Sequence, residues 1–241
     1  ADTTGTGSAT GDAPSADVVF WEGTWNTVKI NTEIAAIILE HGYDITVEQV
    51  DVSAAIMQQS LMNGEIDVNL ELWCINREQY CQENFGEDQP LTMLSPVYED
   101  STQGWYIPRY VVEGDEARGI EPMAPDLASV DQLPDYADLF ADPANPGQGR
   151  LLAGVTGWAI TADNQVKLHA YGLDGAYNAQ TVGSQAALDA AIVGAIQQGE
   201  PILAYYWTPT WIMGKYDMIK LEEPGWSDAC EQARAEATSQ G

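Results

Sequence analysis

The 241-residue sequence has few positive charges, few cysteines and no long apolar stretch. Nine Lys and Arg stand against 37 Asp and Glu, which gives a formal net charge of −28. A chain so negative repels phosphates, so we expect neither a nucleic-acid partner nor attachment to an anionic lipid surface. No apolar run approaches the roughly 18–20 residues that a membrane-spanning helix needs, which excludes such a helix.

The acidity does not mark a disordered chain, because hydrophobic residues make up 45% of the sequence and include eight Trp. Residues 1–17 differ from the rest, since they are small and polar and contain no large apolar side chain. We expect this stretch to be a flexible linker. It has neither the basic nor the apolar region of a signal peptide, so we expect any such peptide to have been removed.

The three cysteines, Cys74, Cys81 and Cys230, form an odd set. One pair and one leftover thiol is the usual interpretation in an exported protein. Cys74 and Cys81 are close enough in sequence to bridge a short turn, which leaves Cys230 free or paired elsewhere; three reduced thiols are the alternative. There is no CxxC, and His41 and His169 lie apart from the cysteines, so we expect no metal site and no other cofactor.

The first half of the chain alternates patterns typical of strands and helices. Short apolar runs predict strands, while isoleucines at helical spacing and a Ser cap predict helices. In chain order we expect a strand at Val18–Trp21, a helix ending at Gly42, a strand at 45–50, a helix from Ser53 to Gly64 and a strand of alternating pattern at 66–72. This βαβαβ order is typical of a parallel sheet with right-handed crossovers.

The second half repeats these patterns after a proline-rich stretch. The expected elements are a strand at 150–155, a helix at 162–171, a helix from Ser184 to Gly199 and a strand at 202–206. Two α/β lobes fit these patterns better than one large sheet. We expect lobe I at 18–104 and lobe II at 105–211, with the change of lobe near Gly104–Tyr110.

Three tryptophans follow three of the predicted strands: Trp73, Trp158 and Trp207. Trp25 lies in the corresponding loop after the first strand. Open α/β sheets bind ligands outside the carboxyl ends of their strands, so the shared position favours a ligand site over the packing role that a single Trp usually has. A cage of indole faces suits a cation that donates no hydrogen bonds, such as a quaternary ammonium group.

Arg77 lies four residues after Trp73. Its guanidinium group suits a ligand carboxylate, which it can bind through two parallel hydrogen bonds. Spacing alone favours the alternative, a surface Arg paired with one of the many acids. The backbone N–H groups of Gly23 and Thr24 are the next candidates for a carboxylate contact.

Several segments also carry a family resemblance: Gly64–Asp67 leading to Glu71–Trp73, Gly104–Pro108, Gly154–Trp158, and Ala204–Trp211 followed by Leu221–Pro224. Together they resemble the glycine betaine and proline betaine substrate-binding proteins of ABC importers. The resemblance implies an α/β type II periplasmic-binding-protein fold. Such a fold has two lobes, each with a mainly parallel sheet flanked by helices, and a ligand cleft between them. It also implies that residues 212–241 return to lobe I.

The resemblance implies roles for individual residues as well. The three aromatic rings that box a trimethylammonium group fall on Trp73, Trp158 and Trp207, and a basic carboxylate contact falls on Arg77. Trp25 matches a ligand position of choline-type relatives. Thr210 stands where another branch has His, so only a hydroxyl is available there.

The implied partners are a betaine-like small molecule and an ABC permease in the membrane, and we expect the receptor to be a monomer. The implied location is extracytoplasmic, in the periplasm or at the cell surface, where a lipid anchor would belong to a segment outside this sequence.

Other functions remain to be weighed against a betaine receptor. Choline, carnitine or a sulfonium analogue would suit the same cage. A secreted sugar-binding module also uses exposed Trp, but the segments beside the three Trp offer few amides and carboxylates for ring hydroxyls. The sequence contains no G-x-S-x-G, no H-E-x-x-H and no Gly-rich phosphate loop, so we expect no enzyme.

Overall fold

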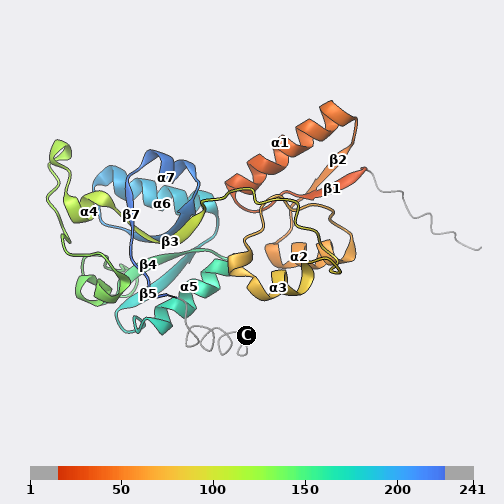
Figure 1. Cartoon of the computed structure of the whole chain (residues 1–241). Helices are drawn as coiled ribbons and strands as arrows, with labels where there is room; N and C mark the ends of the chain where they lie inside the picture. Colours follow the sequence, from red (N-terminus) through yellow and green to blue (C-terminus); the bar gives the residue numbers. More distant parts are fainter. Residues whose placement is uncertain (1–15, 226–241) are drawn as a thin grey trace, which may run out of the picture. The chain divides into compact units, whose positions relative to one another are not determined.

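The computed structural model describes residues 16–225, which divide into two compact units (Figure 1). Unit 1 extends to Leu72 and unit 2 begins at Trp73. Most of the expected linker, the end of the segment expected to return to lobe I, and Cys230 lie outside the described residues. Each unit is described by itself below.

Unit 1 is built on two parallel strands, β1 (Val18–Trp21) and β2 (Val47–Val50). They are followed by α1 (Asn26–Tyr43) and α2 (Ala54–Asn63). These elements confirm the predicted order. The side chain of Ser53 caps α2 as expected, and Gly64 ends it in the left-handed conformation. The end of α1 was predicted one residue early, because Asp44 rather than Gly42 adopts the left-handed conformation, which a short polar side chain tolerates.

The predicted third strand at 66–72 is wrong, because pairing is limited to one parallel bridge between Phe20 and Val68. The N–H of Trp21 donates to the Val68 carbonyl at 3.0 Å. Just beyond, the side-chain oxygen of Asn69 accepts the N–H of Glu71 at 2.9 Å. A local bond of this kind competes with a strand ladder, and it turns Glu71 into the interior of the unit.

Unit 2 contains a five-stranded sheet in the order β5-β4-β6-β3-β7. Its strands are β3 (Thr102–Pro108), β4 (Gly149–Val155), β5 (Tyr177–Val182), β6 (Leu203–Thr208) and β7 (Met218–Lys220). Strand β4 is parallel to β5 and β6, whereas β3 is antiparallel to β6 and β7. Four strands therefore run in one direction and β3 runs in the other, which confirms the α/β class and a mainly parallel sheet.

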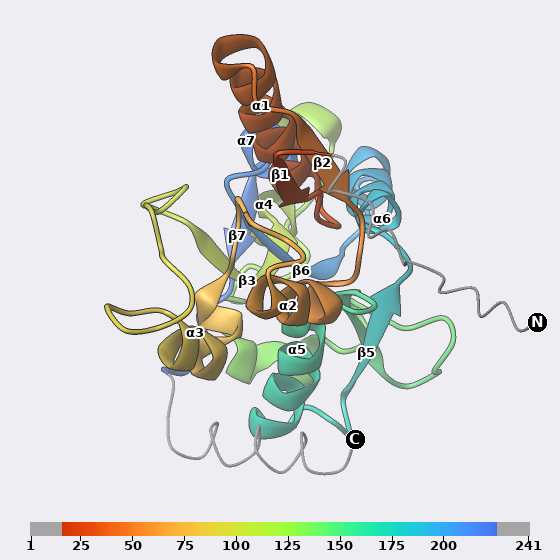
Figure 2. The same cartoon turned by 90° about the vertical axis from the view of Figure 1, so that its right-hand side faces the viewer.

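Helices flank this sheet. In both views, α6 lies above the sheet and α5 below it (Figures 1 and 2). The longer helices are α5 (Ala159–Ala170) and α6 (Gln185–Gln198), and the shorter ones are α3 (Glu78–Asn84), α4 (Arg109–Glu113) and α7 (Trp211–Lys215). Three 3₁₀ turns complete the unit: η1 (Cys74–Asn76), η2 (Glu116–Arg118) and η3 (Val130–Tyr136). No helix within residues 16–225 is both long and apolar enough to cross a bilayer.

The expected lobe boundaries, 18–104 and 105–211, stay a prediction. In the structure, β3 spans residues 102–108 and so crosses position 104. Strand β7, which belongs to the segment expected to return to lobe I, pairs with β3 in unit 2.

Candidate ligand-binding site

Trp158 and Trp207 lie together at the carboxyl ends of two neighbouring strands. Trp158 caps α5, three residues after β4, and Trp207 is the next-to-last residue of β6. Because β4 and β6 are adjacent and parallel, their ends meet at one edge of the sheet. The ring centroids are 5.3 Å apart with an interplanar angle of 81°. The structure thus brings together two of the three predicted cage residues.

The turn from β4 to α5 places Trp158, and a glycine makes that turn possible. Gly154 has a φ of +124°, and a Cβ at this position would lie 2.8 Å from the hydroxyl oxygen of Thr161. That hydroxyl donates to the Val155 carbonyl at 2.7 Å, which fixes the first turn of α5 against the end of β4. The Gly-x-x-Gly-Trp pattern in the sequence therefore reflects a close approach of helix and strand.

Two buried tyrosines support Trp207. The Tyr206 ring stacks on it at 4.7 Å and the Tyr205 ring at 6.1 Å, with interplanar angles of 29° and 23°. The Tyr206 hydroxyl donates to Asp189 at 2.7 Å. Burial raises the pKa of both phenols above the usual value, and the hydrogen bond to Asp189 adds to the effect for Tyr206. Both tyrosines therefore stay neutral donors at physiological pH.

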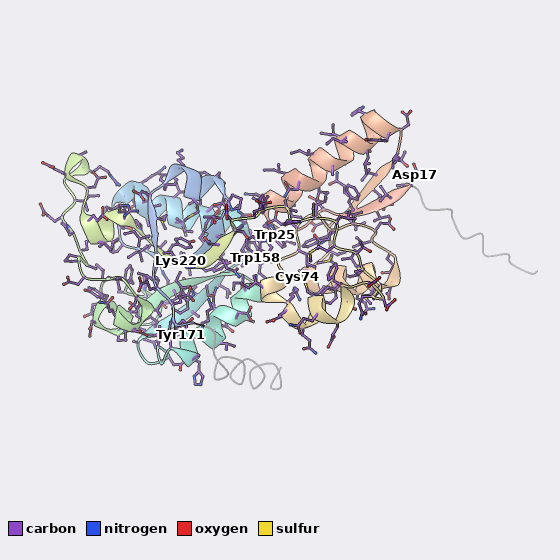
Figure 3. The ribbon with its side chains drawn as sticks, in the orientation of Figure 1. Asp17, Trp25, Cys74, Trp158, Tyr171 and Lys220 are labelled. Carbon is purple, nitrogen blue, oxygen red and sulfur yellow. A yellow bond between two sulfur atoms is a disulfide. The ribbon has the colours of Figure 1, made fainter. Side chains whose placement is uncertain are left out.

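Trp73 and Arg77 flank the 3₁₀ turn η1 at the start of unit 2. A disulfide joins Cys74 and Cys81, with their Cα atoms 5.8 Å apart, which confirms the expected pairing. The Arg77 N–H donates to the Cys74 carbonyl at 2.9 Å, so Arg77 follows Trp73 by one tight turn. Both side chains are half-buried. The turn η1 packs on α5, and Figure 3 shows Cys74 near Trp158.

An amide pair, which the sequence analysis did not identify, joins this loop to the sheet. The side-chain nitrogen of Gln103 in β3 donates to the Asn76 side-chain oxygen at 2.6 Å. The Gln103 oxygen accepts the Tyr205 hydroxyl at 2.9 Å. No sequence signal marks this pair, because its members are 27 residues apart and belong to common polar types.

Thr210 supports the backbone near Trp207. Its hydroxyl caps α7 by accepting the Met213 N–H at 3.4 Å, and it donates to the Trp207 carbonyl at 3.2 Å. The hydroxyl that the sequence offers to a ligand is thus already engaged with the main chain.

Unit 1 carries the other three predicted residues, Gly23, Thr24 and Trp25, in the loop between β1 and α1. The Trp25 ring packs edge-to-face on Trp21, with centroids 5.3 Å apart and an angle of 75°. Gly23 has a φ of +82°, and a Cβ at this position would overlap the side chain of Val28 in the core. The loop therefore requires glycine at position 23.

A buried carboxylate, that of Glu71, fixes the Trp25 loop. Only 4% of the Glu71 surface is exposed. One of its oxygens accepts the Trp25 indole N–H at 2.7 Å and the Thr27 hydroxyl at 2.9 Å, while the other accepts the Asn31 amide at 3.2 Å. A buried charge needs such partners, and these three come from the N-cap and the first two turns of α1. In the sequence, Glu71 stands out only as part of the Glu71–Trp73 segment.

Unit 2 contains the paired rings of Trp158 and Trp207 and the guanidinium group of Arg77. Within residues 16–225, no group of three or more His, Cys, Asp or Glu side chains is placed to hold a metal ion. Indole faces attract a cation by their quadrupole, and Arg77 offers paired donors to an anion.

Comparison with known proteins gives a family and several similar structures. The model of the substrate-binding domain of ABC-type glycine betaine transport systems matches residues 16–238. A glycine betaine/L-proline-binding protein (ProX) from Borrelia burgdorferi is 22% identical with a TM-score of 0.63, over 86% of this chain and 69% of that one. Lactococcal OpuAC, solved in a closed conformation with glycine betaine, is 20% identical with a TM-score of 0.62, over 87% and 70% of the two chains. A choline-binding protein of an ABC transporter, solved with choline, is 16% identical with a TM-score of 0.62, over 85% and 64%.

The TM-scores show a shared fold, which confirms the type II periplasmic-binding-protein fold expected from the sequence. The family match extends over nearly the whole sequence and confirms the resemblance. Members of the family are substrate-binding receptors, which confirms the expectation that this protein is not an enzyme. The chain belongs to the family of substrate-binding domains of ABC-type glycine betaine transport systems.

Proposed function

We propose that this receptor binds glycine betaine, or a quaternary-ammonium osmoprotectant like it, and delivers it to an ABC importer. The observation that carries the proposal is the Trp158–Trp207 pair, whose rings stand at 81° to one another. Two indoles at right angles form a corner for a trimethylammonium group, and because Trp207 is only 3% exposed here, a ligand that touches both rings must displace side chains packed on Trp207. Each indole contributes about 0.5–2 kcal/mol of attraction to such a cation.

Trp73 supplies a third wall in this proposal, and Arg77 binds the ligand carboxylate. The disulfide loop supports this assignment, since Trp73 immediately precedes Cys74 and Arg77 lies inside the loop that Cys74 and Cys81 close. Tryptophan cannot replace Arg77 here, because its ring faces are negative. The backbone N–H groups of Gly23 and Thr24 are a further candidate for the carboxylate, whereas Thr210, whose hydroxyl donates to the Trp207 carbonyl, acts through the backbone beside Trp207.

Choline is the second candidate, and the contacts of Trp25 favour it. The carboxylate of Glu71 accepts the Trp25 indole N–H, which places a negative charge at the edge of that ring. A charge of this sign attracts a ligand that carries only a cation and repels the carboxylate of a betaine. The fold similarity to a choline-binding protein agrees with this candidate.

As a member of its family, the protein is a substrate-binding component that acts outside the cytoplasm. Delivery to a membrane permease, action as a monomer and a periplasmic or cell-surface location, with or without a lipid anchor, belong to the proposal.

Titration calorimetry with glycine betaine, proline betaine, choline, carnitine and a neutral sugar tests the proposal. We expect the betaines to bind most tightly and the sugar not to bind. Tight binding of choline with weak binding of betaine would select the second candidate. Binding of the sugar alone would overturn both.

A further inference from the structure

The side chain of Gln103 contacts two parts of unit 2 that are far apart in sequence. Its nitrogen donates to Asn76 at 2.6 Å, and its oxygen accepts from Asn76 at 3.3 Å and from the Tyr205 hydroxyl at 2.9 Å. All three residues are half-buried or buried. An amide suits this place because it donates and accepts at once without carrying a charge.

Each partner of Gln103 adjoins a residue of the proposed site. Asn76 lies in η1, between Trp73 and Arg77. The Tyr205 ring stacks on Trp207, and Gln103 is itself the cross-strand partner of Trp207 in the β3–β6 ladder. One amide therefore connects the loop that carries two proposed ligand residues with the strand that carries a third.

The disulfide cannot provide this connection. Cys74 and Cys81 belong to the same short segment, so their bond closes the loop on itself and leaves its attachment to the sheet unchanged. The Gln103–Asn76 pair crosses from the loop to β3. The two features are complementary, since the disulfide sets the shape of the loop and the amide pair sets its place.

We propose that Gln103 is a positioning residue for ligand binding, which holds the Trp73–Arg77 loop at a fixed place beside the Trp158–Trp207 pair. The inference rests on the proposed function. It assigns to Gln103 an effect on selectivity as well as on affinity. Displacing the loop moves Trp73, which any quaternary-ammonium ligand uses, and Arg77, which only a ligand with a carboxylate uses.

The test compares Gln103→Met, Asn76→Ala and the double variant in the full chain. Methionine keeps the length of the side chain and removes the amide. Gln82→Met is the matched control, because the Gln82 amide bonds only to Glu78 within α3 at 2.8 Å and is exposed.

We expect each single variant to weaken glycine betaine binding about tenfold and choline binding about threefold or less, in line with the loss of one or two hydrogen bonds. The affinity of the double variant for glycine betaine should equal that of the single variant with the lower affinity, because the two residues act as one contact. Gln82→Met should bind both ligands as the unaltered protein does. Unchanged affinities, or equal weakening for both ligands, would overturn the inference.

Amide hydrogen exchange in the absence of ligand separates this inference from the proposed function. The Arg77 and Cys81 N–H groups are bonded within the loop, to Cys74 and Arg77 carbonyls, at 2.9 and 3.0 Å. Gln103→Met should accelerate exchange at these two amides several-fold and leave β6 unchanged. If the unaltered protein binds none of the ligands, the proposed function fails, and unaltered exchange at Arg77 and Cys81 would then also reject the positioning role.

Discussion

Both units contain an edge-to-face pair of tryptophans among the described residues, and the two pairs have nearly the same geometry. Trp21 and Trp25 in unit 1 are 5.3 Å apart at 75°, and Trp158 and Trp207 in unit 2 are 5.3 Å apart at 81°. Their supports differ. In unit 1, the Trp25 ring is held by a hydrogen bond from its N–H to the buried carboxylate of Glu71. In unit 2, the Trp207 ring is held by the stacked rings of two tyrosines.

A ring beyond a strand end can therefore be held in place either by a charged group or by packing. The charged support is directional and depends on the ionised state of a single group. The packed support is spread over large apolar surfaces and depends on the whole core of unit 2. The two units should therefore fail under different perturbations.

The largest expected effect comes from Trp207→Ala, which removes a ring that is only 3% exposed. We expect unit 2 to lose about 3–5 kcal/mol of unfolding free energy, together with about 1–3 kcal/mol of betaine binding. Urea unfolding and calorimetry measure the two losses. Trp211→Ala is the control, since that ring is 48% exposed, and it should cost far less stability. Equal losses in the two variants would mean that packing does not hold Trp207.

Arg77→Ala separates the carboxylate contacts of the two units. If Arg77 in unit 2 is the main contact, betaine binding should weaken by about 2–5 kcal/mol, because a desolvated carboxylate loses its partner. Choline binding should change far less, because choline has no carboxylate. Calorimetry with both ligands gives the comparison. If Arg77→Ala weakens the binding of both ligands equally, or of neither, the backbone N–H groups of Gly23 and Thr24 in unit 1 become the candidates for the carboxylate contact.

Alkaline pH should destabilise unit 2 in particular. Burial raises the folded-state pKa of Tyr177, Tyr205 and Tyr206 above the usual value of about 10. Above pH 10 the unfolded chain loses these protons while the folded chain keeps them, so stability that is fully present below pH 10 declines as pH rises. Unit 1 within the described residues has a single tyrosine, Tyr43, which is 69% exposed.

We expect the unfolding free energy of unit 2 to fall by about 2–3 kcal/mol between pH 8 and pH 10.5, summed over the three phenols. Hydrogen exchange resolved by segment would measure each unit separately. A uniform loss in both units would point to the general negative charge of the chain instead.

Glu71→Gln is the smallest change and acts on unit 1. It keeps the shape of the side chain and removes the charge that accepts the Trp25, Thr27 and Asn31 donors. We expect a loss of about 1–2 kcal/mol in the unfolding free energy of unit 1 and a shift of the Trp25 indole N–H resonance in NMR spectra. The control is Glu33→Gln, because Glu33 is exposed on α1 and should contribute within about 0.5 kcal/mol. An unmoved indole resonance would show that Glu71 does not place Trp25.

The positions of Trp158 and Trp207 could be predicted because they follow from chain order alone. Parallel strands put their carboxyl ends at one edge, so residues after two such strands meet there. The caps at Ser53 and Ser184 were also readable, because capping is local.

What escaped prediction depends on contacts distant in sequence or on side chains that compete with the backbone. The reversed direction of β3 is set by its neighbours in the sheet rather than by its own pattern. The alternation at 66–72 resembled a strand, but Asn69 ends the pairing after one bridge. The roles of Glu71 and Gln103 arise from partners tens of residues away, to which sequence spacing gives no access.

The two tryptophan pairs also have an optical consequence. Indoles 5.3 Å apart couple their electronic transitions, and such coupling gives a signal in near-ultraviolet circular dichroism that depends on the angle between the rings. Each unit thus holds its own coupled chromophore, and replacing Trp25 or Trp158 by Phe would remove one signal and leave the other. A molecule seated against the Trp158–Trp207 corner alters the field around that pair alone. The near-ultraviolet circular dichroism of the protein therefore reports on each of the two units without an added dye.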